Sequence, residues 1–311
     1  MAEESTSTVL LAGGANLVIA IAKVLGGLLT GSTAMLAEGA HSVADTLNQV
    51  FLLTAIKRSG KPADAQHPFG YGMERYFWSL LAAVGIFVLG AGFSMFEGVS
   101  AILQPKELSG LVIAYGVLGV SFVFEGVSWT KAMLQVRNEA RQQGIGTFEH
   151  LRRTTDPTAK TVAFEDSAAL IGLVLAALGI TLHALTEQGF WDGAASVAIG
   201  VLLIGVAYVL GRENKAMLIG QALDRDTQEG VRSEITAAPG VNQVIELLTM
   251  RLAPDEVLIA VRVDMDDAAS GDDLERFADD VDSRVRERFP EVRHVFLDPT
   301  SAHPTEPLPR T

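Results

Sequence analysis

The sequence predicts a membrane protein: an all-α bundle of six transmembrane helices, followed by a small cytosolic α+β domain. Of the 311 residues, 49% are hydrophobic, and the mean hydropathy is +0.29. The apolar residues gather in the first two thirds of the chain, whereas much of the acid follows residue 222. A helix that spans a bilayer needs about 20 mostly apolar residues. Six stretches meet this condition: residues 8–30, 33–56, 76–103, 110–134, 160–186 and 190–211.

The charges of the joints between these stretches predict the orientation. The joints after the first, third and fifth stretches contain one Lys and no Arg, whereas KRSGK follows the second and further basic residues surround the joint after the fourth. Basic loops stay on the cytoplasmic side of a membrane. We therefore expect both termini in the cytoplasm, and the inner or plasma membrane as the location if the source is bacterial. The start MAEESTSTV lacks the cationic region of a signal peptide, so the first span is expected to remain.

Composition excludes several classes of function. The chain has no cysteine, which rules out disulfides and thiolate metal sites. Its net charge of −13 argues against a nucleic-acid surface. The sequence contains no phosphate loop, cofactor fingerprint or paired nucleophile and base, so we expect neither an enzyme nor a cofactor.

Residues 213–300 have the pattern of a soluble domain. A helical stretch, DRDTQEGVRSEITAAPG, precedes two strands, VNQVIELLTMRL and EVLIAVRVDM; a second helix, SGDDLERFADDVDSRVRERF, precedes a last strand, VRHVFLD. In the second strand alternate residues from Val257 to Met265 are apolar, which is typical of a strand with one buried face. The order αββαβ predicts a two-layer, ferredoxin-like domain, and residues 301–311 are expected to form a tail.

Ionisable residues interrupt the second span. His41 and Asp45 are four residues apart, so on a helix they project from one face about one turn apart. Such groups are costly at membrane depth and usually mark an ion or proton path. An imidazole nitrogen and a carboxylate oxygen suit a small divalent metal. A hydrogen bond between helices or a buried ion pair is the other interpretation.

The fifth span offers a second pair, Glu165 and Asp166. Adjacent helical residues point about 100° apart, so the two carboxylates do not easily face one ion. We expect Asp166 to be the ligand, and Glu165 either to reach round the helix or to carry protons. Asn48, on nearly the same face as His41, is a further candidate through its amide oxygen.

Three other features are ambiguous. Lys23 is expected to reach the membrane surface or to pair with a carboxylate of the bundle, and Glu125 is as good a partner for Lys23 as for an ion. Asp64 and His67 lie three residues apart in a loop rich in Pro and Gly before the third span. They predict either a weak secondary metal site or a structured turn.

Several motifs occur in order on these spans: HSVADTLNQ, HPFGYGMERYFW, EDSAALIG and WDGAASVAIGVLL. With the αββαβ domain they resemble the cation diffusion facilitator family, most of all the branch that contains the mitochondrial member of the eukaryotic zinc transporters. The resemblance implies a homodimer in the bilayer that exports zinc, iron, manganese or cobalt ions from the cytoplasm in exchange for protons, by alternating access. It also implies that His41, Asp45 and Asp166 are metal ligands.

The chain departs from the family pattern at informative positions. Zinc-selective members usually have histidine four residues before the span 5 aspartate, where this chain has Val162. The harder ligand set favours iron(II), manganese(II) or cobalt(II) relative to zinc. In the loop before the third span, Tyr71 replaces a third ligand.

The cytosolic domain also departs from the pattern. Positions that carry histidines in metal-sensing members fall on Glu246, Arg262, Glu275 and Phe296, which leaves Asp298 as the clearest remaining match. We therefore expect this domain to dimerise without a binuclear zinc cluster. The alternative to a transporter is a non-transporting partner subunit or a metal-responsive scaffold with the same fold.

Overall fold

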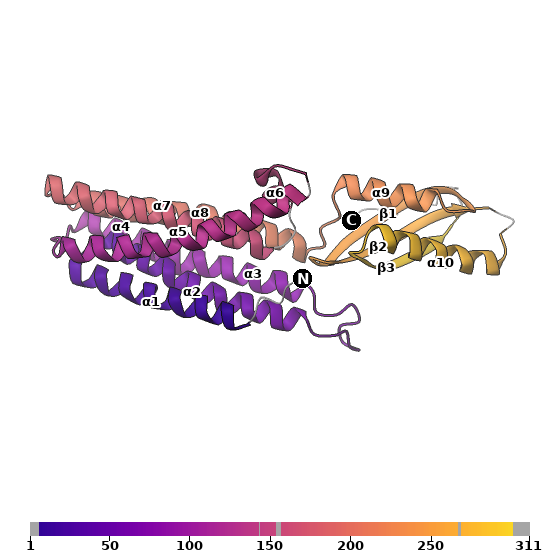
Figure 1. Cartoon of the computed structure of the whole chain (residues 1–311), viewed down its shortest axis with the longest axis horizontal. Helices are drawn as coiled ribbons and strands as arrows, with labels where there is room; N and C mark the ends of the chain where they lie inside the picture. Colours follow the sequence, from indigo (N-terminus) through magenta and orange to yellow (C-terminus); the bar gives the residue numbers. More distant parts are fainter. Residues whose placement is uncertain (1–5, 143, 154–156, 267–268, 301–311) are drawn as a thin grey trace. The chain divides into compact units, whose positions relative to one another are not determined.

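Figure 1 shows the computed structural model, which describes residues 6–142, 144–153, 157–266 and 269–300. The chain forms two compact units. One comprises Met1–Ser59 with Glu74–Lys215, and the other comprises Gly60–Met73 with Ala216–Thr311. The expected tail, residues 301–311, lies outside the described residues.

The first unit is helical. Its elements are α1 (Thr6–Thr30), α2 (Thr33–Ser59), α3 (Glu74–Gly85), η1 (Ile86–Gly92), α4 (Phe93–Leu103), α5 (Leu111–Gln142), the short α6 (Thr147–Arg153), α7 (Pro157–Thr186) and α8 (Phe190–Leu218). The helices α5 and α8 are longer than the spans expected at residues 110–134 and 190–211. The polar residues after each span do not suit a bilayer, but they continue the helix.

Among the residues that the structure describes, four helical stretches are long and apolar enough to cross a membrane: Glu74–Leu103, Leu111–Gln142, Val162–Thr186 and Phe190–Leu218. They indicate an integral membrane protein. The apolar part of α1, Asn16–Thr30, is shorter, and α2 carries Glu38, His41 and Asp45 among its apolar residues. Spanning by α1 and α2, and hence the count of six, stays a prediction.

The third expected span contains an irregularity that the sequence did not predict. Between α3 and α4 lies the π-helical segment η1. A π-helical segment adds a residue to a turn and is frequent at functional sites. A Cβ atom on Gly90 of η1 would lie 3.9 Å from the Cα atom of His41 and 3.8 Å from the Cβ atom of Ala44. The irregular segment therefore runs beside the polar part of α2.

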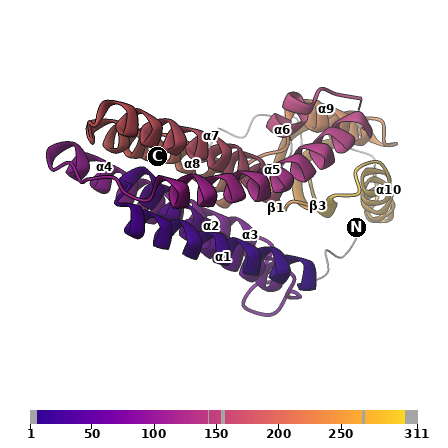
Figure 2. The same ribbon diagram turned by 60° about the vertical axis from the view of Figure 1, so that its left-hand side comes forward.

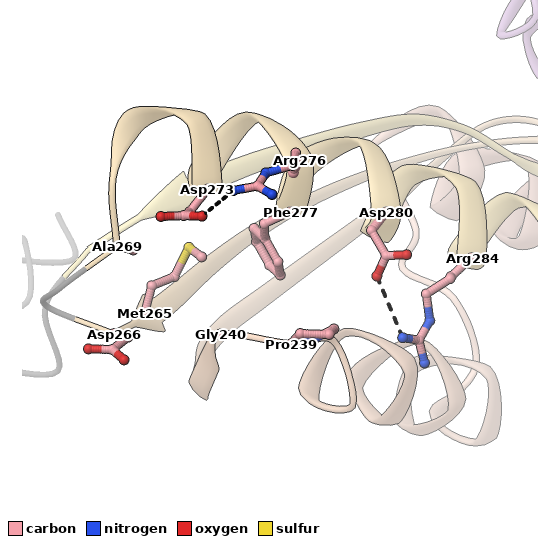
Figure 3. Close-up of a pocket in the computed structure, with 10 residues that line it drawn as sticks. All are labelled: Pro239, Gly240, Met265, Asp266, Ala269, Asp273, Arg276, Phe277, Asp280 and Arg284. Atoms are coloured by element: carbon pink, nitrogen blue, oxygen red, sulfur yellow. Dashed lines mark hydrogen bonds and ion pairs between the residues drawn. The ribbon is translucent and has the colours of Figure 1, made fainter.

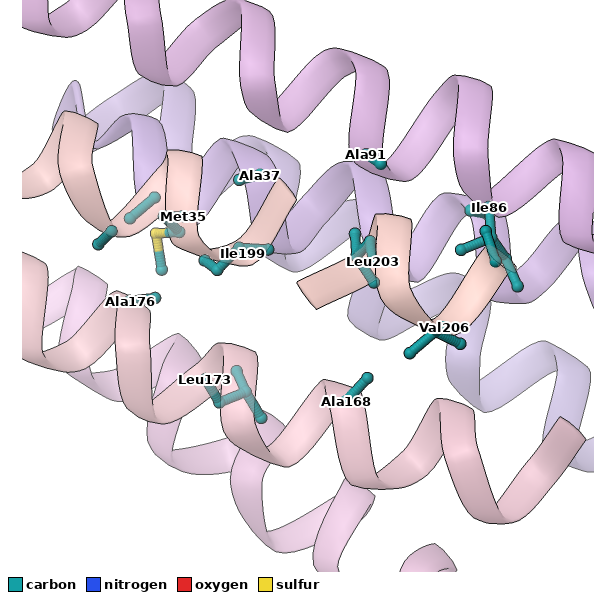
Figure 4. Packing of buried hydrophobic residues seen from close by; sticks show 14 of the residues in the cluster. Met35, Ala37, Ile86, Ala91, Ala168, Leu173, Ala176, Ile199, Leu203 and Val206 are labelled. Atoms are coloured by element: carbon teal, nitrogen blue, oxygen red, sulfur yellow. The ribbon is translucent and has the colours of Figure 1, made fainter. Parts of the chain in front are cut away.

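Small residues allow the helices of the first unit to pack closely. The helix α1 lies along α2, and α5 lies along α7 (Figure 2). A Cβ atom on Gly39 of α2 would lie only 2.8 Å from Val24 of α1, so a larger residue would push these helices apart. Figure 4 shows the centre of the bundle, where Met35, Leu173 and Leu203 belong to one buried cluster. This packing holds α2 in contact with α1, α3, α4 and α7.

The second unit has the order αββαβ: α9 (Arg225–Thr236), β1 (Val241–Ala253), β2 (Glu256–Met265), α10 (Gly271–Arg288) and β3 (Val292–Pro299). The sheet order is β1-β2-β3, with β1 antiparallel and β3 parallel to β2. Alternate residues of β2 from Val257 to Met265 are buried, as the sequence predicted. They pack against Ile235 of α9 and Phe277 of α10 in one core.

The segment Gly60–Met73 between α2 and α3 packs against the sheet of the second unit. The ring of Phe69 lies edge-on to His294 and Phe296 of β3, with centroid distances of 5.3 and 6.3 Å. A Cβ atom on Gly72 would lie 2.7 Å from that of Ala253 in β1. The sequence indicated a loop here, and the structure adds that the loop belongs to the second unit.

Candidate metal site

The helix α2 buries His41 almost completely, beside Asp45. The His41 Nδ1 atom lies 3.5 Å from the Oδ1 atom of Asp45, and the two side chains are 1% and 14% exposed. Within the described part of the chain, neither imidazole nitrogen has a hydrogen-bond partner, and neither does Asp45 Oδ1. A buried polar atom without a partner costs about 1–3 kcal/mol. The pair therefore offers one nitrogen and one oxygen donor that can bind a cation or protons.

Glu165 of α7 is held by α2. The Asn48 side-chain amide donates to both Glu165 carboxylate oxygens, at 2.7 Å for Oε1. Both residues are buried. The Oδ1 atom of Asn48 has no partner among the described residues. The amide of Asn48 thus orients Glu165, while its oxygen is free for another ligand.

Asp166 is held by a different helix. The Ser128 hydroxyl of α5 donates to Asp166 Oδ2 at 2.9 Å, and on the same pair of helices Trp129 Nε1 donates to Ser167 Oγ at 3.0 Å. Ser128 is not predictable from the sequence, because a lone serine in an apolar span has no distinguishing signal. Val162 lies one turn before Asp166 and is partly exposed.

The carboxylates of α2, α5 and α7 face a common region. Asp45 interacts electrostatically with Glu165, Glu125 and Asp166. Over the described ranges, however, no three His, Asp or Glu side chains are arranged to hold one metal ion. The structure thus brings His41 and Asp45 together and keeps Asp166 with Ser128. The ligand set stays a prediction.

A fully buried ammonium group lies near this region. Lys23 Nζ lies 3.0 Å from Glu38 Oε2, 2.8 Å from Ser42 Oγ and 3.4 Å from Glu125 Oε1. The expected pairing of Lys23 with carboxylates of the bundle is confirmed. Because α1, α2 and α5 each contribute a charged residue, the ion cluster fixes these helices together. A Cβ atom on Gly172 of α7 would collide with Glu38.

In the loop before α3, Asp64 closes a turn. Its Oδ1 atom accepts the backbone N–H groups of Gln66 and His67 at 2.9 and 2.8 Å, and its Oδ2 atom accepts the Tyr71 hydroxyl at 2.7 Å. These bonds, led by that of Tyr71, lower the pKa of Asp64. His67 Nδ1 lies 3.7 Å from Asp64 Oδ1. Asp64 therefore has a structural role, and metal binding by Asp64 and His67 stays a prediction.

An arginine lies between two acidic residues on the sheet of the second unit. Arg262 Nε lies 3.0 Å from Asp298 Oδ2, and Arg262 Nη1 lies 3.9 Å from Glu246 Oε2. The three residues are paired across neighbouring strands. Phe296, the next outward-facing residue of β3, contacts Phe69. The guanidinium group already supplies the positive charge that these carboxylates would otherwise take from a metal.

The second unit also contains a groove of about 560 Å³ between α10, the end of β2 and the turn before β1 (Figure 3). Its floor includes Met265 and Phe277. Both arginines that line it are paired, Arg276 with Asp273 and Arg284 with Asp280. These ion pairs satisfy the arginine charges that an anionic ligand would need.

Two family models match the chain. The cation efflux transmembrane domain matches residues 9–219, and the cation efflux protein, cytoplasmic domain, matches residues 223–298. Together they cover both the helical part and the αββαβ part.

Individual relatives agree with these matches. The chain is 30% identical over 313 residues to the proton-coupled zinc antiporter SLC30A9, mitochondrial, of Xenopus laevis, covering 89% of this chain and 56% of the relative. It is 29% identical to metal tolerance protein C4 of Arabidopsis thaliana, covering 89% and 69%. It is 25% identical to the cation-efflux pump FieF of Pectobacterium atrosepticum, covering 93% and 90%. The chain thus spans about half the length of the SLC30A9 relatives that it matches.

Proposed function

We propose, because the chain belongs to the cation efflux family of cation transporters, that it exports a divalent transition metal from the cytoplasm in exchange for protons. The relatives named as a proton-coupled zinc antiporter and as cation-efflux pumps support this proposal. The observation that carries it is the pair formed by the buried His41 and the mostly buried Asp45. Both imidazole nitrogens and Asp45 Oδ1 lack hydrogen-bond partners in the described structure.

The proposed site joins α2 and α7. His41, Asp45 and Asp166 bind the metal, and Glu165 and Asn48 are candidates for the remaining position. Asp166 leaves Ser128 and moves toward His41 and Asp45 when the metal binds. The same groups bind protons when the metal is absent, and a metal requires them deprotonated. Loading of metal and loading of protons therefore compete, which couples the two flows when the site faces each side in turn.

The proposed architecture has six spans: α1, α2, the continuous stretch from α3 to α4, α5, α7 and α8. Residues 1–212 form the transmembrane domain, and residues 213–300 form a cytosolic domain through which two copies associate. Both termini are cytoplasmic. The spans α1, α2, α5 and α7 rock against α3–α4 and α8. The association needs no binuclear zinc cluster, since the ion pairs of Arg262 with Glu246 and Asp298 already occupy these positions.

For the metal, zinc is the substrate in the name of one relative, but this chain has Val162 where zinc-selective members usually have histidine. One imidazole with two carboxylates is a hard ligand set. We therefore propose that iron(II), manganese(II) or cobalt(II) is transported at least as well as zinc.

The test is metal uptake by purified protein in liposomes. Asp45→Ala and Asp166→Ala are expected to abolish uptake while the protein remains a folded dimer by size-exclusion chromatography. Glu97→Ala is a matched control, because the Glu97 carboxylate of α4 pairs with Lys106 beyond the end of that helix, 3.6 Å away. Absence of uptake by the wild-type protein for all four metals would favour the non-transporting scaffold instead.

A further inference from the structure

The N-terminus of α2 is capped by a residue of α8. Asp192, in the first turn of α8, is 3% exposed. Its Oδ1 atom accepts the Ser32 hydroxyl at 2.7 Å, and its Oδ2 atom accepts the Thr33 hydroxyl at 2.8 Å. The backbone N–H groups of Thr33 and Ala34 also donate to Oδ2. A carboxylate at this place satisfies N–H groups that the helix cannot satisfy itself, and it faces the positive end of the helix dipole.

The same turn of α8 also packs tightly against α7. A Cβ atom on Gly179 of α7 would collide with Ala195 of α8 and would lie 3.5 Å from the Cα atom of Asp192. Both helices that carry the proposed metal ligands are therefore in close contact with α8 at one end of the bundle.

Further along α2, two glycines of the third span, Gly85 and Gly90, leave room for a Cβ atom on the side that faces α2. A Cβ atom on Gly90 would lie 3.8 Å from that of Ala44, and one on Gly85 would lie 3.7 Å from Leu47. These are ordinary van der Waals distances. At the far end Arg58 lies 3.6 Å from Glu74, but its side chain is half exposed, and such ion pairs contribute little.

The buried polar contacts, unlike the apolar core that all these helices share, divide the helices into two sets. Lys23 joins α1, α2 and α5, and the Asn48–Glu165 bond adds α7. In the other set, the Ser196 hydroxyl of α8 donates to the Ser94 carbonyl of α4 at 2.9 Å, and Gly98 and Gly193 bring the two backbones close together. Asp192 joins one set to the other.

We infer that Asp192 is a positioning residue that anchors the N-terminal end of α2 to α8, and that this anchor is the pivot about which α2 turns during transport. The inference rests on the proposed function. His41 is eight residues beyond Thr33, or about 12 Å along the helix axis. A rotation of α2 about Thr33 therefore moves His41 past η1 while the bonds to Asp192 persist. The irregular hydrogen bonding of η1 allows this segment to adjust.

Cysteine cross-linking tests the pivot, and no native thiol competes with the introduced pairs, because the chain has no cysteine. Asp192→Cys alone removes the anchor and is expected to slow uptake by about tenfold, the scale of a lost charge-assisted bond. In Ser32→Cys/Asp192→Cys, a short bifunctional thiol reagent replaces the anchor covalently and is expected to restore most of the rate of metal uptake.

A second cysteine pair tests whether α2 moves against η1. In Ala44→Cys/Gly90→Cys, a disulfide fits a Cβ separation of about 3.5–4.5 Å. This second disulfide is expected to stop uptake until it is reduced.

Two results would overturn the pivot: loss of the residual uptake after the 32–192 cross-link, or full uptake with the 44–90 disulfide in place. A merely structural cap predicts no recovery on cross-linking, provided that the Asp192→Cys protein remains a folded dimer.

Cross-linking yields test the pivot separately from transport. Manganese(II), which binds thiolates poorly, is the probe. It is expected to leave the 32–192 yield unchanged and to alter the 44–90 yield. Equal effects on both pairs, or no effect on either, would contradict the pivot, whereas failure of wild-type uptake alone contradicts the proposed function.

Discussion

Asn48 of α2 donates its side-chain amide to both carboxylate oxygens of Glu165 on α7. The bond joins the two helices that carry His41, Asp45 and Asp166. It also distinguishes two adjacent carboxylates, since Glu165 is held by α2 and Asp166 by Ser128 of α5. Of the two carboxylates, Glu165 already has a buried hydrogen-bond partner, Asn48, on α2.

This difference predicts unequal effects of neutralising the two residues. Asp166→Asn is expected to weaken manganese(II) binding at least about tenfold, because a charged metal ligand is lost. Glu165→Gln is expected to have a smaller effect, because the new amide oxygen still accepts a bond from Asn48. Isothermal titration calorimetry of both variants in detergent measures the two affinities. A larger loss of manganese(II) affinity in Glu165→Gln than in Asp166→Asn would show that Glu165, and not Asp166, is the metal ligand.

The ion cluster around Lys23 predicts a large cost for removing one member. Lys23→Met leaves the buried Glu38 carboxylate and the partly buried Glu125 carboxylate without their cation. It is expected to lower the free energy of unfolding by about 3–5 kcal/mol. Lys23→Met/Glu38→Gln is expected to be more stable than the single variant, because it removes one of the unpaired charges.

The matched control is Lys106→Met, because the Lys106 side chain is 55% exposed beside Glu97. This variant is expected to change stability by about 0–1 kcal/mol. Denaturant titration in detergent compares the three proteins. Equal effects of Lys23→Met and Lys106→Met would show that the buried cluster does not hold the bundle together.

Periodicity and charge predicted the parts that depend on local sequence. His41 and Asp45 stand out because they are ionisable residues in an apolar helix. Likewise, β2 follows from its alternating residues, whose burial the structure confirms. Asp166 stands out in the same way, as an ionisable residue in the fifth apolar span, and the resemblance to a family implies the same ligand. Its assignment is still a prediction.

Features that depend on tertiary contacts were not predictable from the sequence. Asp192 looks like one more intramembrane acid, and its role as a cap emerges only when α8 is placed beside Ser32. The π-helical segment η1 has no distinctive composition, because its glycines are shared with regular membrane helices. The contact of Phe69 with β3 joins segments more than two hundred residues apart in the chain, which local patterns do not report.

The hydrogen bonds of Asp64 predict that the stability of its turn falls at low pH. Hydrogen bonds from Tyr71, His67 and Gln66 lower the pKa of Asp64. A carboxyl group with a lowered folded-state pKa stabilises the turn fully above its unfolded value of about 3.9, and this contribution is lost as pH falls through the folded value. Tyr71→Phe removes the largest cause, so the pKa of Asp64 is expected to rise toward its ordinary value and the turn to open at higher pH. Carbon NMR of the Asp64 carboxyl group checks this; an unchanged titration in Tyr71→Phe would show that the hydroxyl is not responsible.

Val162 predicts the selectivity. Val162→His places a softer nitrogen donor one turn before Asp166, and is expected to raise zinc uptake relative to manganese(II) and iron(II). Competition among zinc, iron(II), manganese(II) and cobalt(II) in one liposome preparation measures the ratios, with Val162→Leu as the control for size. Unchanged ratios in Val162→His would contradict the argument from ligand hardness.

The coupling of metal to protons is tested most directly by the initial rate of metal uptake into liposomes under an imposed pH gradient. With the interior more acidic than the exterior, uptake of manganese(II) or zinc is expected to accelerate, and a proton ionophore that collapses the gradient is expected to remove the acceleration. Asp45→Ala is expected to give no uptake under either condition. Wild-type uptake at the same rate with and without the gradient would contradict proton-coupled export.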